Sequence, residues 1–424
     1  MARDWQLTTL DNGLRVLTTA VPTAQSASTA FFVRVGSRNE DPRTNGLSHY
    51  IEHMLFKGTE TRPKATQISQ AIEGAGGSLN AYTTKELTTY WNNVPFERAE
   101  TALEVLADMV QHSLLEGEEI DRERTVVQQE IKRAHDNPGS FVGELLGLAV
   151  YGDQPIGWPI AGSVETVEEM QRSDLMEHMG QYYTAENAVL SVSGNVEHEQ
   201  VVEQAAAAFQ DLPNGTPPSP PASQQDRPEA YLQLDPRDLE QTNVAISMRA
   251  IARKDPDHYA LDLMNTALGR GMSSRLFQEV RERRGLAYSV SAGGARFSDT
   301  GSLTVSAGVT REHQEEAIEV ILTELRKFVD EPMGDEELQR TKDYAAGSFR
   351  LSLETPMALG QRYGSQLLMD GEIEPPDETV EAIRAVTAED IQQVAKRIIG
   401  PGIFSIAVVG PTADADRLDA LLHG

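Results

Sequence analysis

Residues 213–228 form a stretch rich in proline and serine that divides the chain of 424 residues near its midpoint. The stretch shows no apolar periodicity, and its composition is typical of an extended, solvated linker. The segments on either side, residues 1–212 and 229–424, each have the length of an ordinary domain. The chain is therefore expected to fold as two domains joined by this linker.

The two halves carry similar short segments in the same order. The matching pairs are residues 118–120 with 336–338, 165–170 with 378–383, and the apolar strand segments 188–194 with 404–410. The members of each pair are separated by similar lengths of chain. One short match would be weak evidence, but several matches in the same order indicate that the halves arose by duplication.

Strand and helix patterns occur together in the first half. Alternating or continuous apolar character predicts strands at residues 14–19, 30–35, 78–83 and 88–94. Helical spacing predicts helices at residues 46–56, 65–74, 97–112 and 117–136. Because the strands come in adjacent groups, we expect an α+β fold with two homologous α/β-sandwich-like domains. In each domain, helices would pack over one face of a largely antiparallel sheet.

Composition limits both the partners and the metal ligands. The chain contains no cysteine, so disulfides, thiolate ligands and a cysteine nucleophile are excluded. A net charge of −28 argues against nucleic-acid binding and against docking on anionic lipid. This charge is expected to form a solvated acidic coat; adaptation to a salty cytoplasm or a preference for basic peptides is the alternative.

Two further features bear on location. No run of eighteen apolar residues indicates a membrane span, and the first residues contain neither an apolar signal core nor an Arg-rich transit pattern. A cytoplasmic protein without membrane contact is expected.

The segment His49-Tyr50-Ile51-Glu52-His53 contains candidate metal ligands and a candidate general base. On a helix, His49 and His53 lie about 40° apart, so both imidazoles can reach one ion. Catalytic zinc takes three protein ligands and leaves one position open, and Glu52 would stand beside that position as a general base. The alternative is an amphipathic helix with two partly exposed histidines.

The third ligand is sought on the helix predicted at residues 117–136. Glu123 and Glu130 are seven residues apart and therefore share one helix face. One carboxylate could bind the ion while the other orients a ligand from behind. Spacing alone does not distinguish them from the neighbouring glutamates of an exposed acidic helix.

At this point the chain resembles the family of pitrilysin, insulinase and mitochondrial processing peptidase, whose zinc motif is HxxEH. The family places the third ligand after 76 intervening residues, counted from the second histidine, and another glutamate seven residues before that ligand. These positions correspond here to Glu130 and Glu123. The resemblance continues through residues 46–49, 54–59, 76–83 and 273–277, and from Arg281 to Tyr288. It covers essentially the whole chain.

The resemblance implies roles outside the zinc motif. Arg281 and Tyr288 would hold the substrate backbone and stabilise the oxyanion, whereas the alternative is a solvated arginine and a tyrosine on a sheet face. Asn80 and Ala81 would lie on an edge strand that pairs with an extended peptide, unless that strand is internal. The segments of the second half that correspond to the zinc site, residues 263–269 and 345–349, contain no histidine and no acid.

These features predict a Zn²⁺-dependent endopeptidase that hydrolyses peptide substrates without a covalent intermediate. The resemblance implies a chamber closed by four such domains, so this chain is expected to form a homodimer, or a heterodimer with a related chain. Arg281 and Tyr288 would act in the same chain or across the dimer. A non-catalytic subunit of a heterodimeric processing complex and a metal enzyme with another hydrolytic reaction are the alternatives.

Overall fold

The computed structural model describes residues 5–224, 231–411 and 415–423. The last four residues of the predicted linker, 225–228, therefore lie outside the described residues, and its described part contains neither helix nor strand. The chain divides into two compact units. Unit 1 comprises residues Met1–Lys132, Pro159–Pro221 and Arg350–Pro375, and unit 2 comprises Arg133–Trp158, Ala222–Phe349 and Pro376–Gly424.

Unit 1 is built on a six-stranded sheet with the order β1-β2-β6-β3-β5-β4. Its strands are β1 (Trp5–Thr9), β2 (Arg15–Ala20), β3 (Ser26–Val33), β4 (Ser78–Thr83), β5 (Thr88–Pro95) and β6 (Ala188–Gly194). Its helices are α1 (Leu47–Met54), α2 (Ala65–Glu73), α3 (Ala99–His112), most of α4 (Gly117–Asp136), α6 (Val164–Glu169), α7 (Arg172–Tyr182), α8 (His198–Ala208) and α12 (Pro356–Asp370). All strand pairs are antiparallel except β2 with β6.

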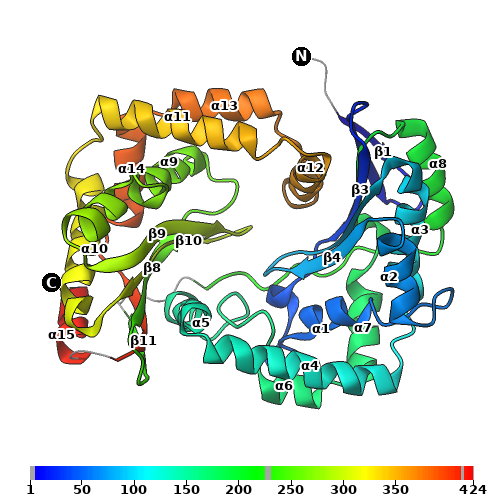
Figure 1. The fold of residues 1–424 in the computed structure, drawn as a ribbon, viewed down its shortest axis with the longest axis horizontal. Helices are drawn as coiled ribbons and strands as arrows, with labels where there is room; N and C mark the ends of the chain where they lie inside the picture. The colour runs from blue at the N-terminus through cyan, green and yellow to red at the C-terminus, as the bar shows by residue number, and fades with distance from the viewer. Residues whose placement is uncertain (1–4, 225–230, 412–414, 424) are drawn as a thin grey trace. The chain divides into compact units, whose positions relative to one another are not determined.

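Unit 2 is built on a five-stranded sheet with the order β7-β11-β8-β10-β9. Its strands are β7 (Tyr231–Pro236), β8 (Thr242–Ala250), β9 (Ala287–Arg296), β10 (Gly301–Val309) and β11 (Ser405–Gly410). Its helices are α5 (Pro138–Tyr151), α9 (His258–Gly269), the π-helix η4 (Phe277–Arg283), α10 (Gln314–Asp330), most of α11 (Asp335–Leu351), α13 (Pro376–Ala385), α14 (Ala388–Ile398) and α15 (Ala415–His423). Figure 1 shows both sheets with their helices.

The two sheets share one topology. Removing β1 from the first leaves β2-β6-β3-β5-β4, which matches β7-β11-β8-β10-β9 strand for strand. The parallel pair stands in the same place in both, as β2 with β6 and β7 with β11. The predicted α+β class and the largely antiparallel sheets are confirmed, and the shared strand order agrees with duplication.

The domain boundaries expected from the linker differ from those of the units. Helix α5 belongs to the first half of the chain but packs in unit 2, and α12 belongs to the second half but packs in unit 1. The compact units therefore differ from the expected domains, residues 1–212 and 229–424, by an exchange of two helices. The physical reason is that each sheet has a second apolar face, which the exchanged helix buries.

Close packing of α12 on the unit 1 sheet depends on two glycines one helical turn apart. A Cβ at Gly360 would lie 2.4 Å from the Ser193 hydroxyl oxygen, and one at Gly364 would lie 2.3 Å from the Phe32 ring. Since real Cβ atoms do not approach so closely, the two glycines let the helix lie directly on β6 and β3.

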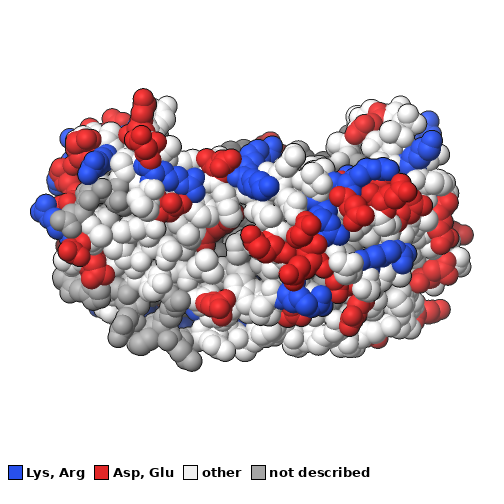
Figure 2. All heavy atoms as spheres, turned by 90° about the horizontal axis from the view of Figure 1, so that it is seen from below, with Lys and Arg blue, Asp and Glu red and all other residues white. Residues whose placement is uncertain are grey.

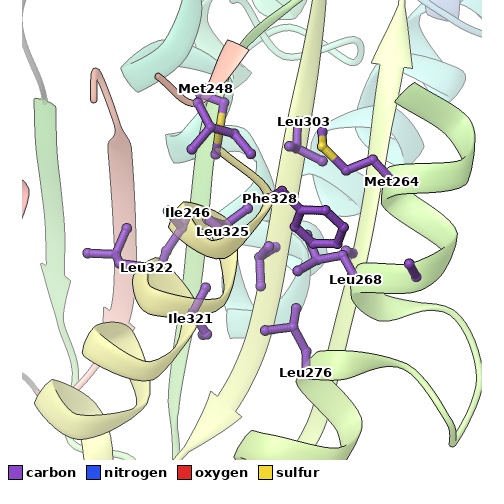
Figure 3. Packing of buried hydrophobic residues seen from close by; sticks show 14 of the residues in the cluster. Ile246, Met248, Met264, Leu268, Leu276, Leu303, Ile321, Leu322, Leu325 and Phe328 are labelled. Carbon is purple, nitrogen blue, oxygen red and sulfur yellow. The ribbon is translucent and has the colours of Figure 1, made fainter. Parts of the chain in front are cut away.

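The opposite face of each sheet carries the main core. In unit 2, residues of β8, β10, α9 and α10 pack together there, including Ile246, Leu268, Leu303 and Phe328 (Figure 3).

None of the described helices is long and apolar enough to cross a membrane. On the face drawn in Figure 2, acidic and basic side chains are interspersed among uncharged ones.

Candidate metal centre

Helix α1 separates its apolar residues from its polar ones. Leu47, Tyr50, Ile51 and Met54 are buried in the core of unit 1. The helical period places the residues at 49, 52 and 53 on the other side of the helix. The amphipathic pattern that folds α1 against the sheet thus presents the HxxEH side chains together.

A buried carboxylate anchors the start of α1. Glu40 accepts hydrogen bonds from the backbone N–H groups of Gly46 and Ser48, both at 2.7 Å, and from the Asn45 amide at 3.1 Å. Burial raises the pKa of Glu40, although these hydrogen bonds oppose the change. An acceptor at a helix N-terminus satisfies N–H groups that have no partner within the helix. This contact fixes the turn that carries His49.

Helix α4 brings the glutamates to α1. Its Val127 and Ile131 are buried in the same core, and the Tyr50 hydroxyl of α1 donates to the Ile120 carbonyl of α4. This packing places Glu130 opposite the two histidines. The ligand atoms of His49, His53 and Glu130 all lie within 4.8 Å of one another.

The donor set fits a zinc ion. His53 Nε2 lies 3.5 Å from Glu130 Oε2, and His49 Nε2 lies 3.9 Å from the same oxygen. Ligands about 2.1 Å from a tetrahedral zinc ion are separated by about 3.4 Å, so only small shifts are needed. Two imidazoles and one carboxylate form a known catalytic zinc set, which leaves a fourth position open.

Glu123 lies directly behind one of these histidines. His53 Nδ1 donates to Glu123 Oε1 at 2.7 Å, and Lys57 Nζ lies 2.5 Å from Glu123 Oε2. Burial raises the pKa of Glu123, but the bonds from His53 and Lys57 outweigh it, and the net pKa is lowered. With Nδ1 engaged, His53 turns Nε2 towards Glu130. This is the orienting contact that ligating histidines usually make.

The two histidines have different acid–base properties. Burial lowers the pKa of His49 to about 4, with a smaller contribution from His53, so His49 is neutral at pH 7. Burial also lowers the pKa of His53, but the hydrogen bond and charge of Glu123 exceed that effect and raise the pKa overall. His49 therefore needs no deprotonation at pH 7 to act as a ligand.

Glu52 is held by a residue that the sequence did not single out. The Thr83 hydroxyl, at the end of β4, donates to Glu52 Oε2 at 2.5 Å. Burial raises the pKa of Glu52, against the effects of the Thr83 bond and of His53. A raised pKa moves a carboxylate towards the range in which it exchanges protons near neutral pH. The segment 76–83 belongs to the family pattern, but no sequence signal marks this hydroxyl.

The remaining predicted residues belong to strand β4 of unit 1 and to unit 2. Asn80 and Ala81 lie on β4, the last strand of the sheet, which pairs with β5 alone among the described strands. In unit 2, the guanidinium carbon of Arg281 lies 5.3 Å from the centre of the Tyr288 ring, and the tyrosine is 77% exposed. The edge position of β4 is observed, while the binding roles of all four residues stay predictions.

The equivalent part of unit 2 carries a different group. Residues 263–269 lie on α9 and residues 345–349 on α11. Nearby, Asp262 Oδ2 lies 3.2 Å from Arg296 Nη2. Within the described ranges, no second group of three histidine or acidic side chains lies as close together as His49, His53 and Glu130.

Comparisons with known families agree along both halves. The model described as insulinase (peptidase family M16) matches residues 15–164, and the model described as peptidase M16 inactive domain matches residues 169–344. The first contains the histidines and glutamates of the cluster. The second covers α9, Arg281 and Tyr288.

Similar proteins match over nearly their full lengths. An uncharacterized zinc protease of Streptomyces coelicolor is 38% identical over 97% of this chain and 91% of its own. The uncharacterized zinc protease YmxG of Bacillus subtilis is 33% identical over 96% of this chain and 98% of its own. The crystal structure of a protease from Helicobacter pylori superimposes with a TM-score of 0.88 at 23% identity, covering 96% of this chain and 99% of the other. At that identity, the structural match shows the fold alone.

Proposed function

Because the chain belongs to the insulinase family of peptidases (peptidase family M16), we propose that it is a zinc-dependent endopeptidase acting on unfolded peptides or short protein segments. The observation that carries this proposal is the grouping of His49, His53 and Glu130, with Glu52 one residue from a ligand position. These residues would hold Zn²⁺, and Glu123 would orient His53.

Each residue around the cluster has a defined task in this proposal. A bound zinc ion supplies a Lewis acid that activates water and polarises the scissile carbonyl. Glu52 takes the proton of the attacking water and delivers it to the leaving amine, so no covalent intermediate is needed. Its raised pKa suits both steps, because the group must accept a proton and then release it.

Two further pairs would handle the substrate. Asn80 and Ala81 would pair through their main chain with an extended peptide, which is consistent with the edge position of β4. Arg281 and Tyr288 would hold the substrate backbone and stabilise the oxyanion, a task for which a cation and an exposed hydroxyl are suited. Main-chain pairing recognises extended conformation more than sequence, so substrates would be selected for flexibility.

We further propose that the active form is a homodimer that encloses a chamber. The support is that the His49, His53 and Glu130 cluster and the Arg281–Tyr288 pair occur in one chain. Two copies of this chain would therefore contain all the residues proposed for catalysis and substrate binding. Arg281 and Tyr288 would serve the cluster of their own chain or that of the partner. The proposed location is the cytoplasm, as the sequence predicts.

A non-catalytic subunit of a heterodimeric complex is the second candidate. The match of residues 169–344 to the inactive-domain model favours it for that part of the chain. The retained set of His49, Glu52, His53 and Glu130 favours catalysis in the other part.

The test uses the full chain alone with an unstructured peptide of about twenty residues. Parent protein and Glu52→Gln are loaded with equal zinc, and cleavage is followed by mass spectrometry with and without a chelator. The proposal requires cleavage that the chelator abolishes and that the variant lacks. Zinc-loaded parent that leaves every such peptide intact, alone and after mixing with related chains, would establish the non-catalytic alternative.

A further inference from the structure

We propose that the Thr83 hydroxyl is a positioning group that holds the Glu52 carboxylate in its working orientation. The inference deepens the proposed function, on which it rests, because it names the residue that controls the general base. Thr83 is the last residue of β4, three residues from Asn80, whereas Glu52 lies on α1. The bond therefore joins the helix of the ligands to the strand proposed to bind peptide.

The Thr83 hydroxyl engages one of the two carboxylate oxygens of Glu52 in a hydrogen bond. Thr83 Oγ1 lies 2.5 Å from Glu52 Oε2. No other hydrogen bond to this carboxylate is present within the described residues. A hydroxyl has one proton to donate and a carboxylate only accepts, so the direction of the bond is fixed. Oε2 is occupied by Thr83, and Oε1 is left to receive the proton of the attacking water.

The backbone around Thr83 is fixed by the β4–β5 hairpin. Thr83 pairs with Thr88 in the sheet, and the next residue, Thr84, donates its N–H to the Leu87 carbonyl at 2.8 Å. The Thr88 hydroxyl donates to the Val35 carbonyl at 2.9 Å. Because the backbone of Thr83 is fixed by this hairpin, its hydroxyl does not move together with the Glu52 side chain. Thr83 can therefore restrict Glu52, which has rotatable bonds of its own.

The chemical value of this restriction is orientation. A general base must lie within hydrogen-bonding distance of the proton that it removes, and a small misplacement reduces the rate strongly. Glu52 also acts twice in the proposed reaction, first towards water and then towards the leaving amine. Holding Oε2 keeps Oε1 at the reacting side through both steps.

A purely structural role for Thr83 is the alternative, because α1 contacts β4 and the bond could simply attach them. The two roles predict different kinetic results. Loss of an attachment would lower thermal stability and zinc affinity together. Loss of orientation would lower kcat and leave KM, stability and zinc affinity close to those of the parent.

The variants are Thr83→Val, which removes the hydroxyl and keeps the shape, and Thr83→Ser, which retains it. Thr29→Val is the matched control, since the buried Thr29 hydroxyl on β3 has no hydrogen-bond partner among the described residues. Each full-length protein is loaded with zinc. The measurements are thermal stability, zinc affinity by chelator competition, and kcat and KM on one fluorogenic peptide.

The inference predicts that Thr83→Val lowers kcat by roughly tenfold to a hundredfold, the usual effect of losing one hydrogen bond to a charged group. KM and zinc affinity should change less than about twofold, Thr83→Ser should recover most of kcat, and Thr29→Val should match the parent. Parent-like kcat in Thr83→Val, or a loss of kcat that follows equal losses of zinc and stability, would overturn it.

Crystal structures of the zinc-loaded parent and Thr83→Val separate this inference from the proposed function. The parent should show Glu52 in one conformation on Thr83, and the variant should show it displaced or in several conformations. A parent without peptidase activity would refute the proposed function, yet these structures would still decide whether Thr83 controls the carboxylate. An unchanged Glu52 in the variant would reject the inference.

Discussion

Two equivalent corners of the molecule differ in their chemistry. The α1 corner of unit 1 consists of α1, which follows β3, and the edge strand β4 that it contacts. The α9 corner of unit 2 consists of α9, which follows β8, and the edge strand β9 that it contacts. One corner gathers His49 and His53 beside Glu130, while the other contains the ion pair of Asp262 with Arg296. Among the described residues, only one of the two copies contains a group of side chains that could hold a metal ion.

The comparison extends to the ends of the edge strands. Thr83 forms the last pair of the β4–β5 hairpin with Thr88, and Arg296 forms the last pair of the β9–β10 hairpin with Gly301. In each corner this terminal residue contacts an acidic side chain of the helix, Glu52 or Asp262. The contact between helix and strand end is thus common to both copies, and the histidines make the difference.

The largest expected effect comes from removing a ligand. His53→Ala should lower zinc affinity on the order of a thousandfold, because one of three protein ligands is lost, and peptidase activity should disappear with the metal. Zinc content after dialysis and chelator competition measure this. Thr266→Ala on α9 is the control for the other corner and should leave zinc binding unchanged. Tight zinc binding by His53→Ala would break the distinction between the corners.

Acid sensitivity is the next effect. His178 is buried on α7 beside the Ser48 hydroxyl of α1, at 3.2 Å, and burial lowers its pKa from 6.5 to about 4. Between these two pH values the unfolded chain binds the proton and the folded chain does not, so stability rises with pH through this window and is lost as pH falls. The difference amounts to about 3 kcal/mol at most.

Denaturant unfolding of the parent and of His178→Gln at pH 4.5 and pH 7 tests this effect. The variant should lose the pH dependence that His178 contributes. Effects of other groups, including the raised pKa of Glu40, are common to both proteins and cancel in the comparison. Equal slopes for parent and His178→Gln would contradict the prediction.

A smaller effect is expected for the carboxylate behind His53. Glu123→Gln should weaken zinc binding by about 10- to 100-fold, because an amide orients the imidazole less firmly and leaves Lys57 without its partner charge. Glu337→Gln in unit 2 disrupts a similar pair with Arg275 and should leave zinc affinity intact. Isothermal titration with zinc distinguishes them, and equal affinities for Glu123→Gln and the parent would remove Glu123 from the account.

The smallest effect belongs to the α9 corner. Asp262→Asn removes an ion pair whose acidic side chain is 48% exposed, and such pairs contribute less than about 1 kcal/mol. Thermal stability should change little, and zinc content and kcat should not change. A large loss of activity would show that the α9 corner takes part in the reaction.

Much of the fold follows from local patterns. Apolar periodicity placed β4 and α4 with their observed bounds and β2, β3, β5, α1, α2 and α3 within a few residues. The grouping of two histidines on one helix face is likewise a local property, because the helical period fixes it. Glu130 depends on how α4 packs on α1, and only the family resemblance, with its fixed spacing, selected it from its neighbours.

The exchange of α5 and α12 could not be predicted from these patterns. A helix with apolar residues must be buried, but its sequence does not say against which sheet. The structure shows the reason for the exchange: all residues of β6 and β11 are buried, and a strand buried on both faces needs a second covering layer, which α12 and α5 provide. Thr83 was missed for a related reason: a hydroxyl at a strand end acquires its partner only through tertiary packing.

The central claim, that the α1 corner is the metal site of this chain, is tested most directly by anomalous diffraction at the zinc absorption edge from crystals of the purified parent protein. The account predicts one strong anomalous peak per chain, within bonding distance of His49, His53 and Glu130, and none beside Asp262. A peak at another set of side chains, or no peak in crystals soaked with zinc, would contradict it.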